Sequence, residues 1–256
     1  MIQPGIRAIS FDLWDTLIID DSDEVKRKEM QLPTKKEARR ILVHEALNKN
    51  QVPVSIETVN AAYDAIDTAF DKVWKQLHVT WSVRERLNLL LTALHSGLPD
   101  NEMLALIRRH EEMELDVQPD FVEEAGEVLS VLAGSYKLAV ISDTVFSPGR
   151  VLRKLLQQAG IFKYFHTLVF SDEVLRSKPS SAVFLKACDS LSVAPQELVH
   201  IGDREDKDVA GPHAVGARAI LCTAVKDRTK GGASAAEKIC NNLRELPGLI
   251  DELNAG

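Results

Sequence analysis

An apolar run near the N-terminus, residues 8–11 (AISF), leads directly into the carboxylate of Asp12. Apolar runs of this kind are typical of strands that lie inside a parallel sheet and are covered on both faces. We therefore predict a first strand over residues 6–14. In open parallel sheets, ligands bind beyond the carboxyl ends of the strands, which makes Asp12 a candidate for chemistry. A strand followed by an ordinary aspartate turn is the simpler interpretation, and this stretch alone does not decide between the two.

From residue 119 onward, apolar runs and amphipathic segments alternate along the chain. The apolar runs predict strands at 137–141, 167–170, 198–201 and 217–221. Helical periodicity predicts helices at 120–133, 147–160, 179–191, 208–214 and 242–253. Ser147 is the predicted N-cap of the second of these helices, with Pro148 at its first position. Such alternation implies right-handed crossovers and a parallel sheet with helices on both faces.

Residues 34–118 show helical periodicity almost throughout and contain no convincing strand. Two capping boxes, at residues 34–37 and 82–85, mark helix starts within this region. The highly charged stretch 20–30 in front of it predicts a solvated loop.

The predicted fold class is therefore α/β, with a Rossmann-like parallel sheet core that has helices on both faces and carries an inserted all-helical domain. We expect residues 1–18 and 117–256 to form the core and residues 19–116 to form the inserted domain.

The net charge of −7 argues against general binding to nucleic acids or membrane surfaces. The three cysteines, at positions 188, 222 and 240, show no metal-ligand spacing, which fits a reduced intracellular compartment. The first nine residues lack the pattern of a secretory signal, and no apolar run is long enough to span a bilayer. We therefore expect a cytoplasmic protein, monomeric or homodimeric, without a nucleic-acid or membrane partner.

Polar groups follow several of the predicted strands: Asp12, Ser142 and Asp203, with Lys178 shortly after another strand. A carboxylate pair suits a hard cation such as Mg²⁺. A hydroxyl near a helix start suits a phosphate, and a lysine supplies positive charge for the same phosphate. Taken alone, each residue is better explained as a structural group: Ser142 as a turn former, Lys178 as a surface charge and Asp203 as a loop residue. Their shared position at one edge of the sheet is harder to explain by chance.

At these positions the sequence resembles the haloacid dehalogenase-like (HAD) hydrolase superfamily over nearly its whole length. Residues 11–17 (FDLWDTL) look like the first family motif, and residues 141–143 (ISD) match the second. Residues 177–179 (SKP) match the third, and residues 200–203 (HIGD) with Asp208 match the fourth. The helical insertion resembles the cap of the C1 class, which closes over the site and selects the substrate.

The resemblance implies a role for each residue that contacts the phosphoryl group. Asp12 is the expected nucleophile, which attacks phosphorus to form an aspartyl-phosphate that water then hydrolyses. Ser142 and Lys178 are the expected phosphoryl-binding residues, with Asp143 beside them.

The resemblance also implies Mg²⁺ as the cofactor. Its expected ligands are Asp12, the backbone carbonyl of Trp14 and Asp203. Asp208 is expected to be a further ligand or to support the metal's water shell and the lysine.

One position departs from the family pattern. Most phosphatases of the family carry a general acid two residues after the nucleophile, where this chain has Trp14. Asp15 is a doubtful substitute, because in an extended segment it lies on the side opposite Asp12. Haloacid dehalogenases also lack this acid, but they lack the metal-binding aspartate too, so Asp203 favours phosphate chemistry.

In the insertion, Trp81 and Arg84 belong to a polar and aromatic cluster that precedes a helix. They are candidate substrate-binding residues. The alternative is a structural loop in which Trp81 packs between helices.

These observations favour a Mg²⁺-dependent hydrolase that cleaves a phosphate ester or anhydride of a small metabolite. One alternative is a haloacid dehalogenase that uses the same aspartate in an ester intermediate. Another is a non-catalytic protein that binds a phosphorylated metabolite for a regulatory purpose.

Overall fold

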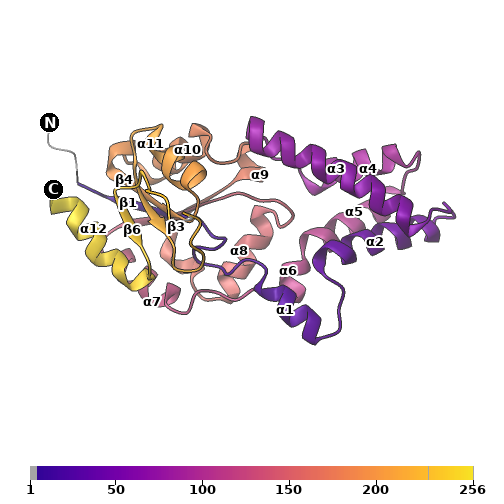
Figure 1. The fold of residues 1–256 in the computed structure, drawn as a ribbon, viewed down its shortest axis with the longest axis horizontal. Coiled ribbons are helices and arrows are strands. Elements are labelled where there is room, and N and C mark those ends of the chain that lie inside the picture. The colour runs from indigo at the N-terminus through magenta and orange to yellow at the C-terminus, as the bar shows by residue number, and fades with distance from the viewer. Residues whose placement is uncertain (1–4, 230, 256) are drawn as a thin grey trace.

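A single six-stranded sheet forms the centre of the molecule (Figure 1). The computed structural model describes residues 5–229 and 231–255. All neighbouring strands pair in parallel, in the order β3-β2-β1-β4-β5-β6. The strands are β1 (Ala8–Phe11), β2 (Lys137–Ser142), β3 (Phe165–Phe170), β4 (Leu198–Gly202), β5 (Arg218–Cys222) and β6 (Lys238–Cys240).

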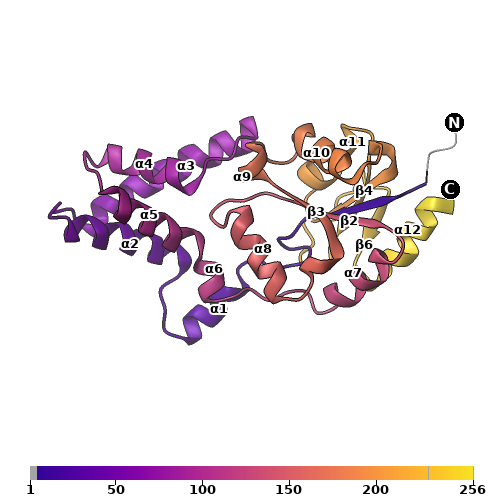
Figure 2. The same cartoon turned by 180° about the vertical axis from the view of Figure 1, so that it is seen from behind.

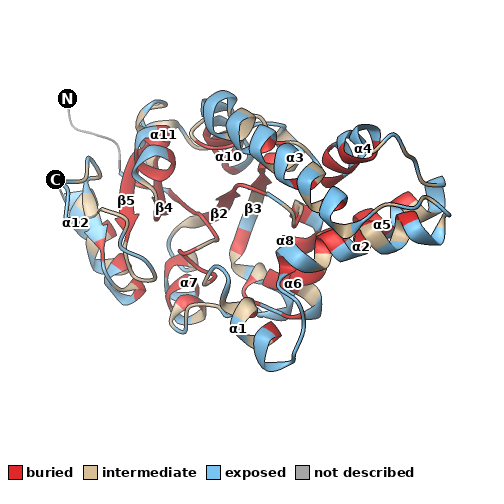
Figure 3. Ribbon diagram, turned by 45° about the vertical axis from the view of Figure 1, so that its right-hand side comes forward, coloured by how far each residue is buried: buried red, intermediate tan, exposed pale blue. Residues whose placement is uncertain are grey.

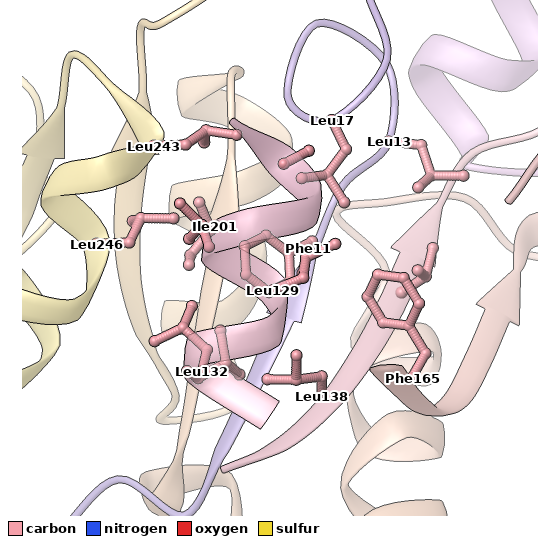
Figure 4. Packing of buried hydrophobic residues seen from close by; sticks show 14 of the residues in the cluster. Phe11, Leu13, Leu17, Leu129, Leu132, Leu138, Phe165, Ile201, Leu243 and Leu246 are labelled. Atoms are coloured by element: carbon pink, nitrogen blue, oxygen red, sulfur yellow. The ribbon is translucent and has the colours of Figure 1, made fainter. Parts of the chain in front are cut away.

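Helices cover both faces of the sheet, as predicted. On one face, α7 (Ala125–Ala133), α8 (Gly149–Gln158) and α12 (Leu246–Ala255) build the largest hydrophobic cluster with the strands. Figure 4 shows Leu129 of α7 and Leu246 of α12 among the buried side chains around Phe11 and Ile201. On the other face lie α10 (Ser181–Leu191) and α11 (Ala210–His213).

β1 and β4 are buried at every position, which explains their nearly continuous apolar sequences (Figure 3). The two polar exceptions, Ser10 and His200, are both fully buried and hydrogen-bonded to each other, with 2.8 Å between Ser10 Oγ and His200 Nδ1.

Between β1 and α7 the described chain is helical, and four of its helices pack around a hydrophobic cluster of their own (Figure 2). We call these four helices the helical bundle: α2 (Lys35–Lys49), α3 (Ile56–Leu77), α4 (Val83–Ala93) and α5 (Asp100–Glu111). The short α6 (Met113–Asp116) follows. Both predicted capping boxes are present, at the starts of α2 and α4. No helix in the described part of the chain is long and apolar enough to cross a membrane.

The prediction of a loop at residues 20–30 is wrong, because α1 (Ser22–Glu29) occupies this stretch. Its Asp23 is fully buried and accepts a hydrogen bond from Lys35 Nζ at 2.9 Å. Arg27 Nε donates to the carbonyl of Pro33, also at 2.9 Å. The charged residues therefore stabilise this helix through partners on the following segment.

The prediction of Ser147 as an N-cap is also wrong. α8 begins at Gly149, and the Ser147 hydroxyl donates to Glu114 instead. β6 and the short α9 (Ser171–Val174) were not predicted, because each has fewer than five residues and too little sequence to show a period.

Candidate active site

The carboxyl ends of the central strands bring three carboxylates together. Asp12 and Asp203 directly follow β1 and β4, and Asp208 lies in the π-helical turn Glu205–Val209. One oxygen from each carboxylate lies within 4.8 Å of the others, and all three residues are buried. Such a cluster of like charges is stable only when cations compensate it.

Lys178 supplies part of this compensation. Its Nζ lies 2.9 Å from Asp12 Oδ1 and 2.6 Å from Asp208 Oδ1, and only 2% of the residue is exposed. Burial opposes the charge of the lysine, but Asp12, Asp208 and Asp143 more than offset this, so that the pKa of Lys178 is raised. Burial raises the pKa of Asp12, and the charge of Lys178 counteracts this. Asp143 Oδ1 accepts a hydrogen bond from the Lys178 backbone N–H at 2.9 Å, which fixes the lysine's position.

A buried chain of hydrogen bonds positions the carboxylate of Asp208. His200 Nε2 lies 3.1 Å from Asp208 Oδ1, while its Nδ1 contacts Ser10. Burial lowers the pKa of His200, so the neutral ring donates from Nε2 to Asp208 and accepts from the Ser10 hydroxyl at Nδ1. The Asp208 Oδ2 accepts from the Arg204 backbone N–H at 3.0 Å. Both oxygens of Asp208 are therefore used within the protein.

Gly202 makes this arrangement sterically possible. A Cβ at this position would overlap the carboxylate of Asp208. Any larger residue would therefore displace Asp208 from Lys178.

Two buried polar atoms at the strand ends have no hydrogen-bond partner among the described residues: Asp203 Oδ1 and Ser142 Oγ. Burial and the charge of Asp12 raise the pKa of Asp203 to about 6, against the opposing charge of Arg228. An unpartnered carboxylate oxygen beside a second carboxylate fits a hard divalent cation with oxygen ligands. An unpartnered hydroxyl fits the oxygen of a phosphoryl group. Trp14, the predicted source of a carbonyl ligand, lines the same cavity as Asp12.

Arg228, from the loop between β5 and β6, was not predicted as part of the site. Its guanidinium bridges two carboxylates, with Nε donating to Asp203 and Nη2 lying 2.5 Å from Asp15 Oδ2. Asp15 adopts a left-handed backbone conformation (φ 53°), and its Oδ1 accepts from the Asp20 backbone N–H at 3.1 Å. Asp15 therefore joins the edge of the site in a turn and an ion pair. No sequence signal identifies a pair separated by more than 200 positions.

A cavity of about 310 Å³ opens beside these residues. From the core, Asp12, Asp143 and Lys178 line it, together with Lys207. The ammonium of Lys207 lies 2.8 Å from Asp143 Oδ2. The cavity has the size of a small-molecule site.

The helical bundle and the segments beside it form the opposite wall of this cavity, with Lys35, Arg39, Trp74 and Glu114. None of these was predicted. Lys35 is the first residue of α2, inside the capping box, and Arg39 follows four positions later. This spacing puts both side chains on one helix face, which was the sequence signal available for them.

The structure does not bring Trp81 and Arg84 to this cavity. The Trp81 ring lies 6.1 Å from the ring of Phe70 in the bundle. Arg84 is exposed at the start of α4.

A family model for haloacid dehalogenase-like hydrolases matches residues 6–216. Glyceraldehyde 3-phosphate phosphatase from Methanopyrus kandleri is 41% identical over 61 residues, which cover 24% of this chain and 26% of that protein.

Two solved structures have similar folds over nearly their whole length. A 2-haloacid dehalogenase from Pseudomonas syringae aligns with a TM-score of 0.65 and 22% identity, covering 97% of this chain and 99% of that one. A HAD phosphatase from Thermococcus onnurineus aligns with a TM-score of 0.63 and 21% identity, covering 96% and 98%. At these identities the similarity shows the fold alone. The choice between phosphate hydrolysis and haloacid hydrolysis has to be argued from the side chains of the site.

Proposed function

Because the chain belongs to the haloacid dehalogenase-like hydrolase family, we propose that it is a Mg²⁺-dependent hydrolase that cleaves a phosphate ester or anhydride of a small metabolite. The observation that carries this proposal is the pair of unpartnered buried oxygens, Asp203 Oδ1 and Ser142 Oγ, beside the ion pair between Asp12 and Lys178. The carboxylate oxygen suits a cation and the hydroxyl suits a phosphoryl oxygen.

In the proposed reaction a carboxylate oxygen of Asp12 attacks phosphorus. The bond from phosphorus to the leaving oxygen breaks, and an aspartyl-phosphate forms on Asp12. Water then attacks this acyl phosphate, releases phosphate and restores the carboxylate. Because Lys178 is held by Asp208, it remains in place to bind phosphoryl oxygens throughout. Ser142 donates its hydroxyl to another of these oxygens.

We propose that Asp12, Asp203 and the backbone carbonyl of Trp14 hold Mg²⁺. The metal, when bound, offsets the negative charge of the phosphoryl group and lowers the repulsion between it and Asp12. Asp208 has both oxygens occupied by protein donors, which favours a supporting role for it.

We further propose that residues 19–116 form a cap over a core made of residues 1–18 and 117–256. This division is supported by the separate hydrophobic cluster of the bundle and by the residues that the bundle contributes to the cavity.

Haloacid hydrolysis is the second candidate, and the absence of a carboxylate at Trp14 favours it. In that case Asp12 would attack carbon and release a halide. Halide release from 2-chloropropionate without added metal would support this candidate over the first.

The first test of the proposal is Asp12→Asn, assayed with p-nitrophenyl phosphate and Mg²⁺. We expect turnover to fall by at least ~10³, since the nucleophile is lost. Asp206→Asn is a matched control, because Asp206 is exposed and lies between the two aspartates of the fourth motif. Unchanged turnover in Asp12→Asn would contradict the proposal.

A further inference from the structure

Arg39 of α2 has no assigned role in the reaction, yet it lines the cavity that contains Asp12 and Lys178. Only 6% of the residue is exposed. Its Nε and Nη2 have no hydrogen-bond partner in the described part of the chain. A buried guanidinium with two nitrogen atoms that lack hydrogen bonds destabilises the fold unless a ligand compensates it.

Nε and Nη2 form one edge of the guanidinium, the edge that binds a carboxylate through two parallel hydrogen bonds. The ring of Phe146 fixes the plane of this group, with the guanidinium carbon 3.6 Å from the ring centroid. The nearest carboxylate is Glu114, whose Oε1 lies 3.5 Å from Nη2. Glu114 lines the same cavity, so a ligand that displaces its carboxylate would reach this edge of Arg39.

Glu114 does not satisfy Arg39, because it has other partners. It lies 3.5 Å from Lys35 Nζ and accepts a hydrogen bond from Ser147. The other buried arginines of the bundle are better paired. Arg40 and Arg86 each have an aspartate oxygen at 2.6 Å.

Trp74 of α3 adds a second unsatisfied donor to the same cavity. Its Nε1 is buried without a hydrogen-bond partner among the described residues. Lys207 lies over its ring, 3.4 Å from the centroid, and keeps the indole in place. An indole N–H only donates, so this group, like Arg39, calls for an acceptor.

Two acidic residues of this wall are paired, whereas burial and the charge of Asp21 raise the pKa of a third, Asp20, to about 6. Besides Glu114, Asp21 also lines the cavity, and its carboxylate lies 3.4 Å from Lys35 Nζ. Among the described residues, the buried atoms that the bundle helices present to this cavity without a hydrogen-bond partner are all donors.

We propose that the substrate is a phosphorylated carboxylic acid, whose carboxylate is bound by the Nε and Nη2 edge of Arg39 and by Trp74 Nε1. This inference rests on the proposed function, because the phosphoryl group is placed at Asp12. The entering carboxylate takes the place of Glu114 at Arg39, while Glu114 keeps Lys35 and Ser147. A cavity of about 310 Å³ limits the acid to a few carbon atoms.

The test compares 3-phosphoglycerate with glycerol 3-phosphate, which differ only in the carboxylate. Binding is measured by calorimetry in the Asp12→Asn variant with Mg²⁺, so that the result does not depend on turnover. We expect the acid to bind at least ~10-fold more tightly, as charge-assisted pairing gives.

Adding Arg39→Gln to this variant is expected to abolish the preference. Arg40→Gln is the matched control on the same helix, and it is expected to keep the preference, since Arg40 does not line this cavity. Trp74→Phe retains an aromatic ring for Lys207 and removes the N–H together with one ring of the indole. We expect it to weaken binding of the acid alone, by about threefold to tenfold.

Equal affinities for the two compounds in Asp12→Asn would overturn the inference, as would a preference that survives Arg39→Gln. Tighter binding of glycerol 1,3-bisphosphate than of the acid would also overturn it, since it would indicate a second phosphate. A preference for the acid without any hydrolysis by the wild-type protein would leave the inference standing and count against the phosphatase proposal.

Discussion

Trp14 is the residue with the clearest consequence for the chemistry. A general acid speeds departure of the leaving group by ~10²–10⁴, and no carboxylate stands at this position. Asp15, the nearest substitute, is bound to Arg228 and to the Asp20 backbone. In the proposed reaction we therefore expect the leaving group to depart without an acid at position 14.

We expect kcat/KM to depend steeply on the leaving group. p-Nitrophenyl phosphate and acetyl phosphate should exceed ethyl phosphate by at least ~10², the size of the missing assistance. Steady-state kinetics over this series checks the slope. Asp15→Asn serves as the comparison: a selective loss with ethyl phosphate would identify Asp15 as the acid, and equal rates across the series in the wild type would contradict the prediction.

Most of the predicted site residues lie next to an apolar strand or a helix start. Asp12, Ser142 and Asp203 could be identified because strand ends meet at one edge of a parallel sheet. Arg228 and Trp74 could not be identified, because their positions depend on how a loop and a helix far along the chain approach that edge. Neither has a local pattern that marks it.

Among the elements, α5 carries a buried histidine that we expect to make stability depend on pH. His110 is 1% exposed, lies 2.6 Å from the Tyr63 hydroxyl and contacts the Leu106 carbonyl at 2.8 Å. Burial lowers the pKa of His110 to about 3, although the contact with Leu106 opposes this. Between pH 3 and pH 6.5 the folded protein therefore keeps the ring neutral, whereas the unfolded chain protonates it.

This difference makes the bundle sensitive to acid. Below pH ~6.5 the unfolded state binds a proton that the folded state does not, so the free energy of unfolding falls as the pH drops toward 3. At pH 5 the loss from His110 is about 2 kcal/mol. Urea unfolding at pH 8 and pH 5 measures this loss. Between the two pH values, the free energy of unfolding of His110→Gln should fall by about 2 kcal/mol less than that of the wild type. His95→Asn, at an exposed position, should behave like the wild type; a His110→Gln that loses as much as the wild type would refute the assignment.

Elements with long periodic segments or capping boxes were predictable, and α2 and α4 begin where the two capping boxes indicate. α1 was not, because its helix is stabilised by Lys35 and Pro33 of the next segment. Local composition favoured a loop, and these contacts outweigh it.

At the scale of the whole molecule, the sheet core and the helical bundle are two hydrophobic clusters, joined by polar contacts and by the ring of Phe146, which packs against the bundle. Arg86 Nη1 donates to the Val145 carbonyl at 2.9 Å, and the Ser177 backbone N–H donates to the His78 carbonyl at 2.9 Å. The proposed metal site belongs to the core cluster, so metal binding should stabilise the fold that positions it.

We expect Mg²⁺ to raise the Tm of the wild-type protein. At 100 times its Kd, an ion that binds only the folded state adds about 2.7 kcal/mol. For a chain of this length that corresponds to roughly 5–10 °C in calorimetry. Asp203→Asn should lose this increase and Asp206→Asn should keep it. An equal increase in Asp203→Asn would show that the cation binds elsewhere.

The position of Trp74 has an optical consequence. Its indole lies under an ammonium group and borders the cavity, so a ligand that enters changes both its solvation and its nearest charge. The tryptophan emission of the intact protein should therefore respond to bound metabolites. Trp74→Phe separates this signal from that of Trp14, which borders the same cavity. Candidate acids can then be titrated by fluorescence, with no need to detect a released product.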